Sequence, residues 1–138
     1  MEKTLVLIKP DAVRGKHIGD IIRIYEEKGL GILAVKMLQM DEKLASRHYE
    51  EHIGRPYYED LMGFMTSGPI IAMVLQGENA IAAVRAINGK TNPAEAAEGT
   101  IRRLYAASGS RNAVHASDSP ENAQREISIF FNASEIYD

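Results

Sequence analysis

GPIIAMVLQG, residues 68–77, is the stretch that decides the fold of this 138-residue chain. Six consecutive apolar residues, Ile70 to Leu75, lie between Gly68-Pro69 on one side and Gly77 on the other. A short apolar run between such breakers is typical of a strand, and a run that is apolar on both faces predicts a central strand. The rest of the chain is therefore expected to supply neighbouring strands and covering helices.

Three other stretches are predicted to form strands of the same sheet. They are residues 4–10 (TLVLIKP), ended by Pro10; residues 31–40 (GILAVKMLQM), apolar and β-branched through Met37; and residues 113–115 (AVH), which make a short strand. Proline ends a strand because it has no backbone N–H for the ladder, and β-branched residues favour the extended conformation.

Four stretches show the periodicity of helices that bury one face. Their expected buried residues are Ile18, Ile21, Ile22 and Tyr25, ended by Gly29; Leu44, Ala45, His48 and Tyr49, after Asp41 as N-cap; Ala80, Val84 and Ile87, ended before Gly89; and Ala123, Ile127, Phe130 and Phe131, after Ser119 as N-cap and Pro120. Residues 90–111 have weak periodicity, and loops of this length in small domains are usually functional or disordered.

The order β-α-β-α-β-α-loop-β-α predicts one domain, residues 1–138, with an α/β (α+β) sandwich of the ferredoxin-like, split βαβ kind: a four-stranded antiparallel sheet covered by helices.

Composition excludes several classes of protein. Apolar residues make up 45% and charged residues 25%, which are ordinary values for a globular domain. No apolar run approaches the ~20 residues of a membrane span, and the N-terminus is a poor signal peptide. The chain has no cysteine, which excludes disulfides and thiolate chemistry, and its net charge is −3. We therefore expect a cytoplasmic protein with no membrane or nucleic-acid partner.

Cationic side chains concentrate around the long loop that leads to His115. They are Arg85, Lys90, Arg102, Arg103 and Arg111, with Lys9 at the end of the first strand. One interpretation is a solvated basic face. Together with the hydroxyls of Thr91 and Ser117, however, this mixture of ammonium and guanidinium groups is suited to several phosphate oxygens.

His115 itself has two interpretations, because single histidines are mostly structural. Glu126 lies on the second turn of the last predicted helix, beside its buried face. From periodicity alone, Glu126 is either an ordinary exposed residue or a carboxylate that fixes the orientation and tautomer of the imidazole.

Two other motifs are weak. The sequence NGKT at residues 88–91 ends like a P-loop, but Val84 stands where the pattern requires glycine, and the motif follows a helix instead of a strand. His48 and His52 have a spacing that suits zinc, but no zincin-type glutamate accompanies them. We expect a packed His48, a partly solvated His52 and no metal ligand from protein side chains.

The stretch NAVHASDS, residues 112–119, resembles the active-site signature of nucleoside diphosphate kinases, Asn-x-x-His-(Gly/Ala)-Ser-Asp-(Gly/Ser/Ala). Four further stretches resemble the same family: TLVLIKPDAV, HYEEHIGRPYY, MTSGPIIAMVL and GKTNPAEAAEGTIR. The resemblance covers nearly the whole chain, with its segments in the order typical of the family.

The resemblance implies a role for each matching residue. His115 would take the γ-phosphate of a nucleoside triphosphate, usually ATP, as a pros-phosphohistidine, and would return it to a nucleoside diphosphate. The phosphates and the sugar hydroxyl would be held by Lys9, Arg85, Thr91, Arg102 and Asn112. Tyr49 would lie beside the histidine, Ser117 and Glu126 would orient it, and Tyr57 and Leu61 would contact the base. Mg²⁺ held mainly by the nucleotide and a homo-oligomer, tetramer or hexamer, are also implied.

Departures from the family pattern affect the base site. Tyr57 stands where phenylalanine is common and keeps the aromatic face. Gly109 stands where many members have an apolar residue, which leaves the second face of the base contact and the base preference open. Ala116 stays within the signature, and Asp118 is expected to be structural.

Two functions of other classes fit only parts of this sequence. A histidine phosphocarrier in a signalling relay would also phosphorylate His115, but it has no use for Lys9, Arg85, Arg102 or an aromatic base platform. A ferredoxin-like RNA-binding module would need a basic, aromatic sheet face, whereas this chain is net acidic and has no RNP1-like string.

Overall fold

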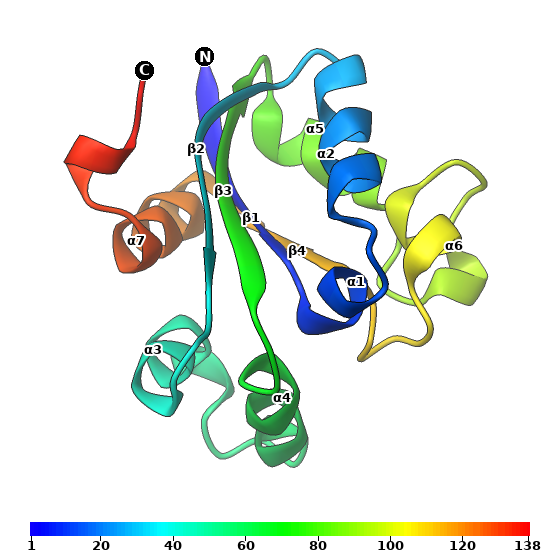
Figure 1. Cartoon of the computed structure of the whole chain (residues 1–138), viewed down its shortest axis with the longest axis vertical. Helices are drawn as coiled ribbons and strands as arrows, with labels where there is room; N and C mark the ends of the chain where they lie inside the picture. Colours follow the sequence, from blue (N-terminus) through cyan, green and yellow to red (C-terminus); the bar gives the residue numbers. More distant parts are fainter.

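Strand β3 (Ile70–Gly77) lies inside a four-stranded sheet, as its apolar sequence predicts. The computed structural model describes residues 1–138. The strand order is β2-β3-β1-β4, where β1 is Glu2–Ile8, β2 is Gly31–Leu38 and β4 is Val114–Ala116, and all neighbours are antiparallel (Figure 1). This order confirms the predicted ferredoxin-like sheet and places β1 beside β3 at its centre.

Seven α-helices cover the sheet. They are α1 (Pro10–Arg14), α2 (Ile18–Glu27), α3 (Glu42–His48), α4 (Tyr58–Met65), α5 (Ala80–Asn88), α6 (Ile101–Tyr105) and α7 (Pro120–Phe130). Helices α2 and α5 lie on one side of the sheet, and α3 and α7 lie on the other (Figure 1). None of these helices combines the length and apolar character that crossing a bilayer requires.

Alternation along β1 divides the core into two layers. Val6 and Ile8 pack with Tyr25 of α2 on one face, whereas Leu5 and Leu7 pack with Phe130 of α7 on the other. All four of these strand residues are fully buried, and burying one such side chain contributes about 1.5–3 kcal/mol. An apolar run is therefore required in β1 as well as in β3.

Local signals at two helix starts act as predicted. The Asp41 carboxylate accepts a hydrogen bond from the Leu44 amide at 2.7 Å, and the Ser119 hydroxyl accepts one from the Asn122 amide at 3.1 Å. Both satisfy backbone donors that have no partner inside the helix.

The structure also corrects the sequence-based prediction at several points. Pro10 does not only end a strand: it is the first residue of α1, where its missing N–H costs nothing. Helix α6 lies within the stretch predicted to be a loop, and α4 was not predicted. The short α6 has too few turns to show clear periodicity. Phe131 is buried, but it lies just after the end of α7.

Candidate active site

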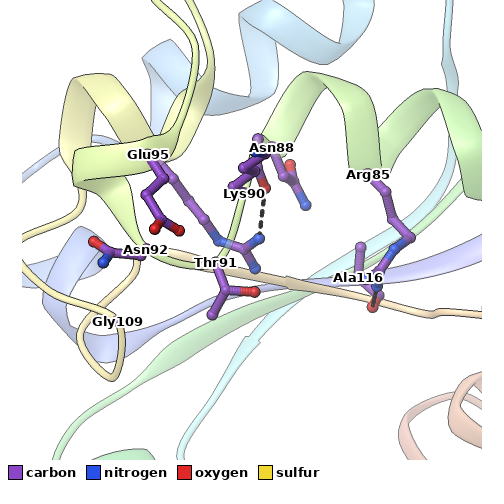
Figure 2. Close-up of a pocket in the computed structure, with 10 residues that line it drawn as sticks. Arg85, Asn88, Lys90, Thr91, Asn92, Glu95, Gly109 and Ala116 are labelled. Atoms are coloured by element: carbon purple, nitrogen blue, oxygen red, sulfur yellow. Dashed lines mark hydrogen bonds between the residues drawn. The ribbon is translucent and has the colours of Figure 1, made fainter.

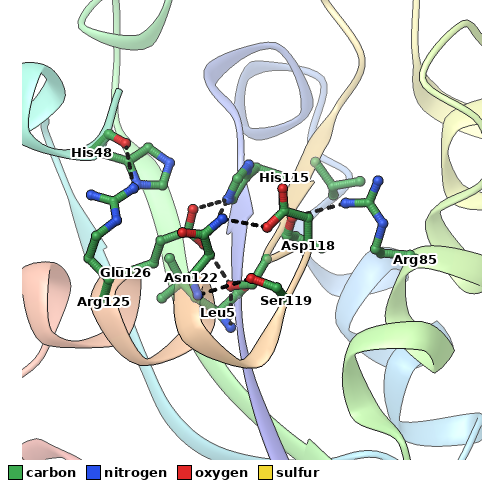
Figure 3. Close-up of polar contacts among 12 residues, drawn as sticks. Leu5, His48, Arg85, His115, Asp118, Ser119, Asn122, Arg125 and Glu126 are labelled. Carbon is green, nitrogen blue, oxygen red and sulfur yellow. Dashed lines mark hydrogen bonds and ion pairs between the residues drawn. The ribbon is translucent and has the colours of Figure 1, made fainter. Parts of the chain in front are cut away.

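His115 lies in the middle of the short strand β4, paired with Leu7 of β1. Its Nε2 lies 3.1 Å and 3.2 Å from the two carboxylate oxygens of Glu126 on α7 (Figure 3). The hydroxyl of Ser117, the residue after the same strand, donates to Glu126 Oε1 at 2.6 Å. Strand β4 and helix α7 therefore hold the imidazole by one nitrogen, and Nδ1 makes no hydrogen bond to the protein.

Glu126 is buried, with 6% of its surface exposed, yet it stays ionised. Burial raises the pKa of its carboxyl group, but the hydrogen bonds from His115 and Ser117 and the charge of His115 bring that pKa below its ordinary value. An ionised Glu126 accepts a hydrogen bond and so favours the tautomer with the proton on Nε2. The lone pair of His115 is then on Nδ1, and of the two alternatives for Glu126 the structure supports the orienting carboxylate.

Two aromatic residues of the α3 end pack near His115. The His48 ring meets the His115 ring edge-on, with centroids 4.7 Å apart, and Tyr49 packs against His48 at 4.5 Å. Burial, followed by the charge of His115, holds the pKa of His48 well below its usual range, so this imidazole is neutral. Burial also raises the pKa of the Tyr49 hydroxyl, with a smaller contribution from Glu126. His48 is packed as expected, and Tyr49 lies beside the histidine pair.

A cavity of about 460 Å³ lies between the end of α5 and the chain around α6 (Figure 2). We call it the cationic cavity; it is lined by Arg85, Asn88, Gly89, Lys90, Thr91, Asn92, Glu95, Arg102, Gly109 and Ala116. Three of the predicted cations therefore meet Thr91 there, and Glu95 is the one acidic residue. His115 itself does not line the cavity, but its neighbour Ala116 does.

Arg102 is held rigidly in this cavity. Its guanidinium donates to the carbonyl of Gly89 at 2.8 Å and to that of Val114 at 2.9 Å, while its buried Nε has no partner. Burial, which is only partly offset by Tyr25, lowers the pKa of Arg102. Two carbonyls therefore orient the cation without neutralising its charge.

A second cavity of about 250 Å³ shares Gly109 with the first. We call it the aromatic cavity; it is lined by Lys9, Tyr57, Asp60, Leu61, Gly109, Ser110 and Arg111. The Tyr57 hydroxyl lies 2.5 Å from His52 Nδ1, which holds the ring of this exposed residue. The structure thus brings Tyr57 and Leu61 together beside Gly109, as the resemblance implies.

Lys9 connects the aromatic cavity with the signature stretch. Its ammonium donates to Asn112 Oδ1 at 2.8 Å, and Asn112 Nδ2 donates to the Gly109 carbonyl at 3.0 Å. Burial, followed by the positive charge of Arg102, lowers the pKa of Lys9 to about 8.

The other two candidate cations, Arg103 and Arg111, do not line the cationic cavity. Arg103 is exposed and makes only a long contact, 3.5 Å, to the Ala94 carbonyl. Arg111 forms a bidentate ion pair with Asp60, at 2.9 Å and 3.2 Å, and its guanidinium lies 4.2 Å from the centroid of the Phe64 ring. Asp60 was not predicted, because nothing in the sequence indicates a pairing across 51 residues.

Asp118 and His52 agree with the sequence-based expectations. Asp118 accepts a hydrogen bond from Asn122 at 2.6 Å, and this bond lowers the pKa of its carboxyl group. That contact stabilises the turn before α7. His52 is partly solvated, with 35% of its side chain exposed.

Comparisons with known proteins identify the relatives of this chain. The family profile described as nucleoside diphosphate kinase matches residues 2–136. A nucleoside diphosphate kinase of Listeria monocytogenes is 55% identical over 136 residues, covering 99% of this chain and 92% of the relative. One from Methanocaldococcus jannaschii is 54% identical, covering 99% and 98%.

Solved structures give the same result. The nucleoside diphosphate kinase of Aquifex aeolicus superposes with a TM-score of 0.96 at 42% identity, covering 98% of each chain. That of Halobacterium salinarum, in complex with CDP, has a TM-score of 0.96 at 42% identity, covering 99% of this chain and 91% of the other. The phosphocarrier alternative finds no support here. Sequence, fold and neighbours agree, and the chain belongs to the nucleoside diphosphate kinase family, whose members exchange a phosphate between nucleoside tri- and diphosphates.

Proposed function

We propose that this kinase transfers the phosphate through Nδ1 of His115. The observation that carries the proposal is the pairing of Nε2 with Glu126, which leaves Nδ1 as the ring nitrogen with a free lone pair. In the first half-reaction, Nδ1 attacks the γ-phosphorus, and the bond from that phosphorus to the β–γ bridging oxygen breaks. The nucleoside diphosphate leaves, and the second half-reaction reverses these steps with another diphosphate.

Electrostatic stabilisation is the main contribution of the surrounding residues. Negative charge spreads over the oxygens of the transferring phosphate, so fixed cations lower the barrier. The proposed cations are Arg85 and Arg102 of the cationic cavity and Lys9 beside Asn112, with Thr91 as a hydrogen-bond donor. The buried, unpartnered Nε of Arg102 supports a polar ligand at this position. Glu126 stabilises the positive charge that the imidazole gains when Nδ1 binds phosphorus.

Mg²⁺ is the proposed cofactor, held by the nucleotide. The cationic cavity offers one carboxylate, Glu95, among three cations, which is a poor protein cage for a cation that prefers six oxygen ligands. The donor set instead fits an ion that arrives on the phosphate oxygens. When bound there, Mg²⁺ supplies further neutralisation of the phosphates.

The aromatic cavity is the proposed site of the base, with Tyr57 and Leu61 as its contacts. A base of any type presents an aromatic face to Tyr57, which suits a kinase of broad specificity. The Halobacterium salinarum relative was solved in complex with CDP, which supports nucleotide binding by this chain.

Self-association into a tetramer or hexamer is also proposed. Val35 and Met37 of the edge strand β2 are 52% and 56% exposed, and a second copy of the chain would cover them. Size-exclusion chromatography with light scattering measures the mass of the assembly. The cytoplasmic location stays a prediction.

Pulse-chase labelling tests the reaction path. The protein is incubated briefly with γ-labelled ATP and Mg²⁺ and is then chased with unlabelled GDP. Label should attach through an acid-labile, base-stable bond and move to GTP, and His115→Ala should lose labelling and turnover together. Label that stays on the protein, or that forms without His115, would contradict the proposed path.

A further inference from the structure

His48 carries an anomaly that the kinase reaction does not explain. The residue closes helix α3 and is 3% exposed, yet neither of its ring nitrogens has a hydrogen-bond partner. Buried polar atoms are almost always bonded, and an exception indicates a water, an ion or a special role. The imidazole is neutral, so one nitrogen carries a lone pair inside the protein with nothing to accept it.

The nearest groups of matching chemistry are His115 and Glu126. One donor atom from each of the three residues lies within 4.8 Å of the others, although the residues come from α3, β4 and α7. Figure 3 shows the His48 and His115 rings on the same side of Glu126. Two imidazoles and one carboxylate form the ligand set of several zinc sites, with the fourth position open to water.

From these contacts we propose that His48, His115 and Glu126 form a site for Zn²⁺ or a similar first-row transition-metal ion, and that this ion inhibits the kinase. The ion would lie between His115 Nε2 and Glu126, where the 3.1 Å separation is already close to that of two ligands on one metal. Metal–ligand distances of ~2.0–2.2 Å require donors ~3.3 Å apart, so a His48 nitrogen would have to approach by ~1–1.5 Å.

The same chemistry distinguishes this site from that of the cofactor. Mg²⁺ prefers oxygen ligands and is bound poorly by imidazole, whereas Zn²⁺ accepts both nitrogen and oxygen. Lys9 and Arg125 add positive charge near His48, and Arg125 donates to the His48 carbonyl at 3.3 Å. These charges oppose a second cation, so the site should be weaker than a structural zinc site and easily reversed by a chelator.

Inhibition follows from the position of the ion and therefore rests on the proposed reaction path. Bound Zn²⁺ takes the lone pair of Nε2, and the ring proton moves from Nε2 to Nδ1. Nδ1 then has no lone pair with which to attack the γ-phosphorus, and Glu126, which ligates the ion, no longer stabilises the charge of the phosphorylated ring. Phosphoenzyme formation should slow, while nucleotide binding by the two cavities should change little.

Metal binding is tested first without nucleotide, by equilibrium dialysis of the full chain against Zn²⁺ and, separately, Mg²⁺. Wild type should bind one Zn²⁺ per chain and no Mg²⁺. His48→Gln should weaken Zn²⁺ binding at least ~10-fold, since loss of a metal's supporting group alone costs that much. His52→Gln is the matched control and should bind like wild type, because His52 Nδ1 is occupied by Tyr57. Thermal unfolding checks that both variants are folded.

A measurement without mutation accompanies the dialysis. The chain has four histidines, and Zn²⁺ should shift the imidazole ¹⁵N resonances of His48 and His115 only. Labelling by ATP is then measured in a metal buffer that fixes the concentration of free Zn²⁺. Zn²⁺ should slow the labelling of wild type, whereas His48→Gln should label at the same rate with and without Zn²⁺. If wild type binds no stoichiometric Zn²⁺, or if His48→Gln binds it equally well, the orphaned nitrogens are met by water and the site is refuted. Failure of labelling in the absence of Zn²⁺ would refute the reaction path instead.

Discussion

Raising the pH should switch off Lys9 before any other cation of the site. Its pKa is lowered to about 8 by burial and by the charge of Arg102. One pH unit above a pKa only about a tenth of the group remains charged, so kcat/KM should fall roughly tenfold between pH 7 and pH 9. A bound nucleotide adds negative charge beside Lys9 and raises its pKa, so kcat at saturation should hold to a higher pH than kcat/KM.

Lys9→Arg is the test of this assignment, because a guanidinium stays charged throughout the range. The pH profiles of kcat/KM for wild type and Lys9→Arg are compared by shape, since the larger side chain also changes the absolute rate. The variant should stay level to pH 9. A fall of the same size and midpoint in Lys9→Arg would assign the alkaline limb to another group and refute the reasoning.

The same shift has a consequence for stability, with a defined sign. Lys9 binds its proton less tightly in the folded protein than in the unfolded chain, whose value is 10.5. The unfolded state therefore holds more protons between pH 8 and 10.5, and the contribution of Lys9 to folded stability rises with pH across that window. A shift from 10.5 to about 8 corresponds to on the order of 3 kcal/mol. In urea unfolding, the stability of wild type relative to Lys9→Met should therefore rise along this window, because only wild type loses the cost of a buried charge.

Three further substitutions have outcomes that the structure defines. Glu126→Gln removes the charge that Nε2 of His115 contacts, so the labelling rate should fall roughly 10–100-fold with little change in the nucleotide KM; an unchanged rate would contradict the orienting role. Gly109→Val adds a side chain where a Cβ meets nothing within 4 Å, so stability should be kept. The added side chain should make about 40 Å² of apolar contact with the base, which is about 1 kcal/mol and should lower KM about fivefold. A higher KM would mean that the base lies elsewhere. Tyr25→Phe deletes the buried 2.6 Å hydrogen bond to Asn88 and should cost about 1–3 kcal/mol in chemical unfolding; a neutral effect would mean that water replaces the hydroxyl.

The sequence predicts those parts of the fold whose burial is repeated along the chain. The run Ile70–Leu75 is apolar on both faces because β3 lies between two helical layers. Asp41 and Ser119 predict the starts of their helices because each side chain accepts a hydrogen bond from the backbone of its own helix. Helix α6 carries no such repeat in five residues and was predicted to be loop. The short-range rules thus hold wherever the deciding contacts are local.

The same distinction between local and long-range contacts applies to the residues of the candidate site. Charge and position beside the loop that leads to His115 indicate Arg85 and Arg102, and position at the end of the first strand indicates Lys9. The roles of all three are implied only by the family resemblance. Asp60 could not be found, because its partner Arg111 is distant in sequence and exposed ion pairs leave no pattern. The sequence correctly predicts that His48 is packed. It does not predict that both ring nitrogens lack a hydrogen-bond partner, because this depends on how three elements pack together.

The unfavourable features of the unliganded site have a common explanation. Lys9 is a buried cation whose affinity for a proton is lowered by burial and by Arg102, and the half-buried Arg102 has a buried nitrogen without an acceptor. In isolation these features destabilise the fold. The charge of Asp11 offsets that of Lys9 only in part, and no carboxylate pairs with either cation as Asp60 pairs with Arg111. A polyphosphate supplies both the missing charge and the missing acceptors. These features lower the stability of the free protein, and nucleotide binding recovers that free energy as affinity. The recovered binding free energy is concentrated at the phosphates, where the transition state gains most negative charge.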